Sequence, residues 1–192
     1  MTPLDISNIA FLAIAVNSKG ARTLPALQKD GTSVTWQIAE PLEVAFEPSA
    51  YNDAENVATR VTLCVTPTDE VYESISALDE WCIQTLSANP VPLLGLQLSP
   101  EQVRERYVSP LKTSEKGGYR SLRLKMNRSG RYALQCYTPE REKCPHPETW
   151  RGCSVQLSVT LKGLFLMGRE YGPVLEATHV ILHESKDAAC PF

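Results

Sequence analysis

The sequence has few of the residues and motifs on which enzymatic catalysis most often depends. Three histidines in 192 residues leave little material for acid–base chemistry. The sequence has no Gly-x-Ser-x-Gly elbow, no phosphate-binding glycine loop ending in lysine and no metalloprotease helix motif. We therefore predict that the protein is not an enzyme and uses no cofactor.

Long apolar runs and an ordered cysteine framework are also missing. The run at 9–16 is eight residues long, whereas a membrane-spanning helix needs about 20. It also lacks the preceding positive charges and the cleavage site of a signal peptide. The six cysteines are too scattered for a disulfide framework in a chain of this length. We expect no membrane association, free thiols, and an intracellular, reducing compartment, either the nucleus or the cytoplasm.

One cluster of soft metal ligands needs separate consideration. Cys136, Cys144, His146 and Cys153 are enough for a tetrahedral zinc site, but only Cys144 and His146 are close in sequence. Structural zinc sites usually contain paired Cys-x-x-Cys motifs, and cysteine is also a common small core residue. The sequence leaves zinc binding open, and we favour a protein without a metal.

The pattern of apolar residues predicts a single domain dominated by strands, over 34–185. Residues 1–33 are expected to form an irregular N-terminal arm, because glycine and proline interrupt them, and 186–192 a C-terminal tail. A long helix is predicted over 67–88, with Thr66 as its cap, and a short one from Pro100 to about Tyr107. Period-two alternation predicts strands at 34–38, 42–46, 57–65, 120–126, 132–137, 155–161, 164–167 and 174–182.

Charge is distributed very unevenly along the chain. Residues 1–102 hold four Lys/Arg against thirteen Asp/Glu, whereas 103–192 hold fifteen against nine. Within 104–131, nine cations face two anions, which gives +7 in a protein with a formal net charge of −3. Surface potentials are local because salt screens charges beyond roughly 8–10 Å, so this basic segment decides the interpretation more than the overall pI does.

The strand at 120–126 gives the basic segment a definite geometry. Leu122, Leu124 and Met126 share one face, whereas Arg123 and Lys125 share the other. Cations interleaved with aromatic residues are typical of surfaces that bind nucleic acid. Charged residues also protect exposed edge strands from aggregation, and this second interpretation stays open.

Two segments, 111–126 and 161–178, resemble single-stranded-DNA-binding proteins encoded by large nucleocytoplasmic DNA viruses. The resemblance covers about residues 100–182 and implies an oligonucleotide/oligosaccharide-binding (OB) fold, a five-stranded barrel. Phe165 stands where that family is expected to have tryptophan. The resemblance would place one group of residues near the basic strand, namely Lys112, Lys116, Tyr119, Arg123 and Lys125. It would place Arg169 and Tyr171 in the closing hairpin.

We therefore predict an α+β, strand-dominated protein, an antiparallel OB-like β-barrel with one long and one short helix. The predicted function is binding of single-stranded nucleic acid with low sequence specificity, with single-stranded DNA as the expected ligand; the sequence leaves the choice between DNA and RNA open. The alternative is an interaction module whose basic face docks an acidic partner, and homo-oligomerisation through the acidic N-terminal half is a further expectation. The expected contact residues are Lys112, Lys116, Tyr119, Arg123, Lys125, Arg128, Arg131, Tyr137, Arg169 and Tyr171, with Tyr132 assigned to packing.

Overall fold

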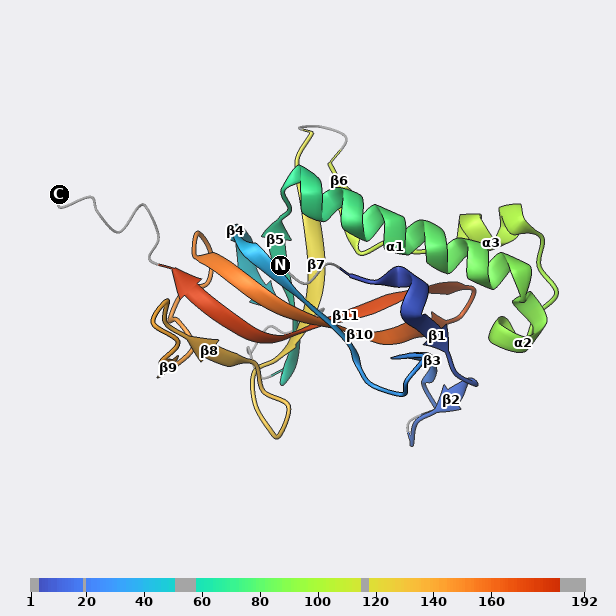
Figure 1. Ribbon diagram of the computed structural model, residues 1–192, viewed down its shortest axis with the longest axis horizontal. Coiled ribbons are helices and arrows are strands. Elements are labelled where there is room, and N and C mark those ends of the chain that lie inside the picture. The colour runs from blue at the N-terminus through green and yellow to red at the C-terminus, as the bar shows by residue number, and fades with distance from the viewer. Residues whose placement is uncertain (1–3, 19, 51–57, 115–117, 184–192) are drawn as a thin grey trace.

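Strands dominate the structure, a computed structural model that describes residues 4–18, 20–50, 58–114 and 118–183 (Figure 1). The helices are α1 (Asp69–Ala88), α2 (Pro90–Leu94) and α3 (Pro100–Arg106), and a short 3-10 helix spans Ile6–Asn8. The strands are β1 (Ile9–Phe11), β2 (Ala15–Val16), β3 (Arg22–Gln28), β4 (Val34–Ser49), β5 (Arg60–Thr66), β6 (Leu111–Thr113), β7 (Arg120–Asn127), β8 (Gln135–Tyr137), β9 (Lys143–Cys144), β10 (Ser154–Met167) and β11 (Glu170–His183). The predicted strand-dominated α+β class is confirmed.

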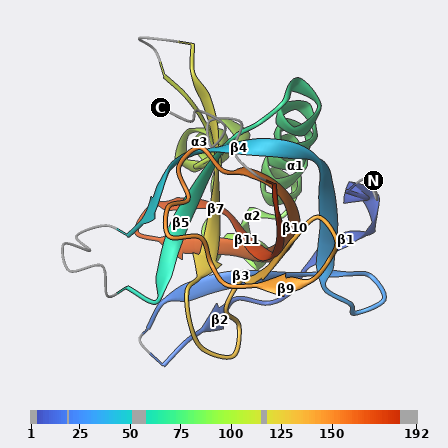
Figure 2. The ribbon, with the colours of Figure 1, turned by 90° about the vertical axis from the view of Figure 1, so that its left-hand side faces the viewer.

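The strands form one sheet that folds back on itself. Its order is β1-β3-β10-β4-β5-β7-β11-β8-β9, with β2 paired to β3 and β6 paired to β7. Because β10 also pairs with β11, the pairings lead from β4 through β5, β7, β11 and β10 back to β4. Most pairs are antiparallel, but β11 is parallel to both β7 and β8. Figure 2 shows these strands arranged around a shared interior.

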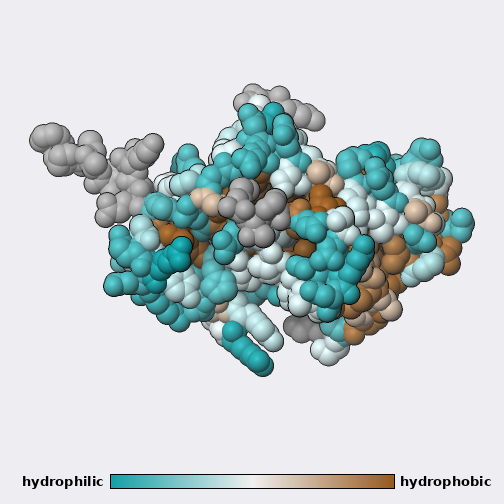
Figure 3. All heavy atoms as spheres, in the orientation of Figure 1, coloured by the Kyte–Doolittle hydropathy of each residue, from teal (hydrophilic) through white to brown (hydrophobic). Residues whose placement is uncertain are grey.

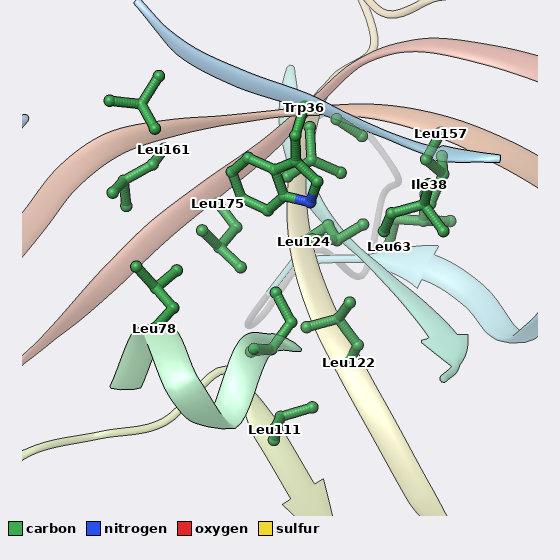
Figure 4. Close-up of a cluster of buried hydrophobic side chains, with 14 of the residues drawn as sticks. Trp36, Ile38, Leu63, Leu78, Leu111, Leu122, Leu124, Leu157, Leu161 and Leu175 are labelled. Atoms are coloured by element: carbon green, nitrogen blue, oxygen red, sulfur yellow. The ribbon is translucent and has the colours of Figure 1, made fainter. Parts of the chain in front are cut away.

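The core lies inside this path of strands and beneath α1. Leu78 of α1 points towards Trp36, Leu124 and Leu175 from three different strands (Figure 4). All four side chains are buried. Burial of the apolar face of α1 holds the helix against the strands, since each such side chain contributes about 1.5–3 kcal/mol when fully removed from water.

The helical region differs from the prediction in two details. The cap of α1 is Thr68, whose side chain accepts a hydrogen bond from the amide of Val71, and not Thr66. A third helix, α2, follows α1 directly because Pro90 restarts the helical backbone after Asn89 has left it, and Gly95 ends α2 in the left-handed conformation. The prediction of one long and one short helix is therefore wrong, because the described residues contain a second short helix, α2.

The predicted irregular arm over 1–33 is also wrong, since it contains β1, β2 and β3. β3 pairs with β10 around Pro25 and Gly163, and Leu24 is fully buried. A Cβ atom at Gly163 would lie 2.1 Å from the carbonyl oxygen of Leu24, so only glycine permits this close approach. The predicted strands at 34–38 and 42–46 are in fact parts of the single strand β4.

Apolar surface gathers at the end of the molecule that carries α2 and the β1–β2 edge (Figure 3). Leu12, Val16, Val91 and Leu96 are the exposed apolar residues of this region. Among the helices of the described ranges, none has the length and apolar character that a membrane span requires. The C-terminal tail predicted at 186–192 lies outside the described residues.

Candidate nucleic-acid interface

β7 is a wall of the core on one side and a cationic surface on the other. Leu122, Leu124 and Met126 are completely buried, whereas Arg123 and Lys125 are exposed. The two-faced geometry predicted for this strand is confirmed. It follows from the period-two alternation of side chains along an extended backbone.

A groove of about 610 Å³ lies along the outer face of β7. Its walls come from β4, β5, β6, β7, β10 and β11 and from the segment that joins α3 to β6. Lys112, Arg123 and Lys125 are its cations, and Glu47 is the one acid among its lining residues. The Glu47 carboxylate accepts hydrogen bonds from the amides of Trp150 and Arg151, at 3.0 and 3.2 Å, so backbone dipoles compensate its charge. The groove is therefore a positively charged channel.

Two exposed aromatic rings stand at the rim of this groove. Phe46 is 54% exposed and Tyr119 is 37% exposed. Their ring centroids are 6.0 Å apart in an edge-to-face arrangement, and the Tyr119 hydroxyl lies 3.1 Å from the hydroxyl of Thr66. These rings offer apolar faces to solvent beside the cations, which is the combination that bases and phosphates require.

Lys125 lies in a crowded cationic environment. Its Nζ donates a hydrogen bond to the Thr62 hydroxyl at 2.9 Å. Neighbouring side chains partly desolvate the Lys125 amino group and lower its pKa, and repulsion by Arg60 and Arg123 lowers it further. Because these cations repel one another in the free protein, an anion bound among them is favoured.

A buried carboxylate fixes the backbone that forms one side of the groove. Asp79 of α1 accepts hydrogen bonds from the Tyr107 hydroxyl at 2.7 Å and from the Ser109 hydroxyl at 2.5 Å. The Ser109 hydroxyl accepts in turn from the amide of Leu111 at 3.0 Å. Burial raises the pKa of Asp79, and the two hydroxyl groups oppose this shift. The network holds the start of β6, and with it Lys112, against α1.

The structure brings only some of the predicted contact residues together. Lys112, Arg123 and Lys125 line the groove, and Tyr119 stands at its rim. Arg128 donates a hydrogen bond to the carbonyl oxygen of Pro48 at 2.7 Å. The other predicted residues lie elsewhere or cannot be placed. Lys116 lies outside the described residues, and Arg169 is exposed in the turn between β10 and β11.

The predicted tyrosines fall in different environments. Tyr171 is only 4% exposed, and its hydroxyl donates to the carbonyl oxygen of Val103 at 2.7 Å. Its ring belongs to the core and presents no free face to a base. Tyr137 stacks on His179, with centroids 6.1 Å apart, and lines a separate hollow of about 450 Å³. The prediction that Tyr132 serves packing is wrong: its side chain is 69% exposed, and the Arg131 guanidinium lies 5.6 Å from its ring centroid.

Two cations of the basic segment are engaged with acidic residues of α1. Arg104 forms hydrogen bonds of 2.6 and 2.8 Å to the Glu80 carboxylate. Arg120 contacts Asp69 at 2.7 Å, and its guanidinium lies 4.5 Å from the ring centroid of Tyr72. The cations of the +7 segment are therefore not all gathered at the groove, and these two lie on the surface of α1.

Phe46 is a candidate contact residue that the sequence does not reveal. Alternation along 42–46 predicts that Phe46 faces the core together with Leu42 and Val44. β4 has register shifts on both sides of Phe46 in its pairing with β5, and the ring points outwards. A β-bulge redirects side chains in this way, and the alternation of the sequence gives no signal of it.

The described ranges contain no group of three or more His, Cys, Asp or Glu side chains placed to hold a metal ion. Cys136, Cys144 and Cys153 are free thiols. The Nε2 atom of His146 lies 2.9 Å from the carbonyl oxygen of Leu134. The geometry therefore gives no support to the zinc hypothesis.

No family model matches the chain, and neither does any curated protein sequence. Its fold, however, is similar to that of a phage protein with solved structures, a single-stranded DNA-binding protein.

The single-stranded DNA-binding protein of bacteriophage Enc34, in complex with ssDNA, aligns with a TM-score of 0.50 and 13% identity, over 90% of this chain and 95% of that chain. A C-terminal truncation of the Enc34 protein aligns with a TM-score of 0.50 and 12% identity, over 91% of this chain and 95% of that chain. The single-stranded DNA-binding protein gp2.5 encoded by bacteriophage T7 aligns with a TM-score of 0.45 and 14% identity, over 82% of this chain and 96% of that chain. At this identity the Enc34 structures show a shared fold. The resemblance to proteins of large nucleocytoplasmic DNA viruses stays a prediction.

Proposed function

We propose that this protein binds single-stranded DNA without a catalytic step and with little sequence preference. The observation that carries the proposal is the groove itself, in which Lys112, Arg123 and Lys125 lie beside the exposed rings of Phe46 and Tyr119. Cations bind the phosphate backbone of any sequence, and a ring stacks on any base. The fold shared with a protein solved in complex with ssDNA supports the same conclusion.

The strand pairing supports an OB-like barrel as the scaffold. β4, β5, β7, β10 and β11 correspond in chain order to the five barrel strands, and the pairings run β4-β5-β7-β11-β10-β4. OB folds bind oligonucleotides on the face formed by their second and third strands. In this chain those strands are β5 and β7, and their outer face carries the groove.

The proposal is tested by fluorescence anisotropy with labelled oligo-dT, the corresponding RNA and a duplex, each at two salt concentrations. We expect tight binding of oligo-dT at low salt. The logarithm of the association constant should fall with the logarithm of the salt concentration with a slope of about −2 for the three groove cations. Absence of binding at low salt would reject the proposal. Binding that does not respond to salt would show that the cations are not the contact.

A matched polyanion separates DNA binding from the docking of an acidic protein partner. Poly-glutamate carries negative charge but no bases, so it can form ion pairs with the cations but cannot stack on the aromatic rings. We expect it to compete poorly with oligo-dT at equal charge. Competition as strong as that of unlabelled oligo-dT would favour a surface for acidic proteins instead.

The aromatic rim provides a separate prediction. Phe46→Ala and Tyr119→Ala should each weaken oligo-dT binding roughly five- to twentyfold, because each removes a stacking surface. The salt slope should stay unchanged, since no charge is lost. Tyr119→Phe keeps the ring and should bind like the wild type. Val16→Ala truncates an exposed apolar residue outside the groove and serves as the control. An equal loss of oligo-dT affinity in Val16→Ala would show that the two rings do not contact the DNA.

A further inference from the structure

A second hollow, of about 410 Å³, adjoins the groove on the outer face of the strands. Val174 borders both the groove and this hollow. Lys125 of the groove lies opposite Glu176 of the hollow in the β7–β11 pairing. The two depressions therefore follow one another across β7 and β11.

The second hollow carries two half-exposed cations, Arg60 from β5 and Lys162 from β10. Both contact the carboxylate of Glu176, at 3.3 and 3.4 Å. The Glu176 side chain is only 8% exposed, so it contacts the two cations from the interior side of the hollow. One buried anion against two half-exposed cations leaves a positive surface, and both cationic groups keep N–H donors that can face solvent.

An exposed aromatic ring completes the hollow. Tyr132 is 69% exposed and lines the hollow together with Asn127. The Asn127 side-chain amide donates to the carbonyl oxygen of Tyr132 at 3.3 Å, which fixes the backbone that carries the ring. The Arg131 guanidinium lies 5.6 Å from the ring centroid, within the range of a cation–π contact.

We propose that this hollow is a second nucleotide subsite, which binds the DNA strand where it leaves the groove past Lys125. Arg60 and Lys162 bind a phosphate, and a base stacks on Tyr132. Glu176 positions the two cations for this contact. The inference rests on the proposed function and extends it to a longer strand with five cations along its path, namely Lys112, Arg123, Lys125, Arg60 and Lys162.

Electrostatic coupling supports the continuity of the two subsites. After partial desolvation, repulsion by Arg60 is the next strongest cause of the lowered pKa of Lys125, so the first cation of the hollow lies within reach of the last lysine of the groove. A phosphate that approaches either group relieves the repulsion felt by both. The two subsites should therefore favour binding of one continuous strand.

The length of the oligonucleotide tests this inference. Oligo-dT of about 4 and about 16 nucleotides represents the two ends of the site sizes found for OB folds. The variant Tyr132→Ala/Lys162→Ala should bind the longer strand about tenfold more weakly than the wild type and bind the shorter strand equally well. Its salt slope on the longer strand should be shallower by about 0.7, since one phosphate contact is lost.

A control removes an exposed apolar side chain and an exposed lysine elsewhere, as Val16→Ala/Lys143→Ala on β2 and β9. It should bind both oligonucleotides like the wild type. Equal affinity of the Tyr132→Ala/Lys162→Ala variant and the wild type for the longer strand would overturn the inference and leave the proposed function intact. Failure of the wild type to bind either strand would reject the proposed function itself. Lys162→Met keeps the aliphatic stem and tests the charge alone, should the double variant unfold.

Discussion

Replacement of Lys112, Arg123 and Lys125 together by alanine is expected to weaken binding of oligo-dT by about 100-fold at about 0.1 M salt. Each phosphate neutralised on a single strand contributes about 0.7 to the salt slope, so three contacts contribute about two orders of magnitude between about 1 M and 0.1 M salt. The slope of the triple variant should become shallower by about 2. Anisotropy titrations over a salt series measure both quantities.

The control for this variant loses the same charge from other surfaces. Lys29, Arg141 and Lys143 are exposed, and none of them lines the groove or the second hollow. The variant Lys29→Ala/Arg141→Ala/Lys143→Ala should lose much less affinity, because charges outside the groove act on it only through a potential that salt screens over about 10 Å. Equal losses in the two triple variants would mean that net charge governs binding and that the groove is not the site.

The strand β7 shows which part of the interface a sequence can predict. Its alternation of apolar and cationic residues is local, and the extended backbone converts it directly into two faces. The partners of the other cations are not local. Arg104 reaches Glu80 and Arg120 reaches Asp69 across the packing of α1, and charge counting along the chain cannot assign such pairs. For that reason the +7 segment overstates the charge of the groove.

The second hollow shows the same limit on a larger scale. Arg60 and Lys162 are 102 positions apart in the sequence, and they meet on Glu176 only because β5, β7, β11 and β10 follow one another in the sheet. The strand β3 is also not predicted from the sequence, because Pro25 and the flanking glycines indicate irregular structure. β3 nevertheless pairs with β10, because tertiary pairing overrides a weak local preference.

Replacement of Asp79 by alanine is expected to reduce the free energy of unfolding by about 2–4 kcal/mol. The substitution leaves the hydroxyl groups of Tyr107 and Ser109 without their acceptor, and each unsatisfied buried polar group costs about 1–3 kcal/mol. Asp79→Asn keeps an oxygen that accepts from Tyr107 and should stay within about 1 kcal/mol of the wild type at neutral pH. Urea denaturation at pH 7 compares the three proteins. A loss in Asp79→Asn as large as that in Asp79→Ala would contradict this account.

The pH dependence separates the charge of Asp79 from its hydrogen bonds. Burial raises the pKa of Asp79 above its ordinary value of 3.8, so the folded protein takes up a proton at a higher pH than the unfolded chain does. Asp79 therefore contributes more to stability as the pH falls through its raised pKa towards 3.8, and less as the pH rises. Asp79→Asn lacks this titration, so the wild type should gain stability relative to Asp79→Asn between pH 7 and about pH 4. A stability difference that stays constant over this range would show that burial does not raise the pKa of Asp79.

Asp79→Ala should also weaken DNA binding, because Ser109 and Lys112 line the groove that this network holds in place.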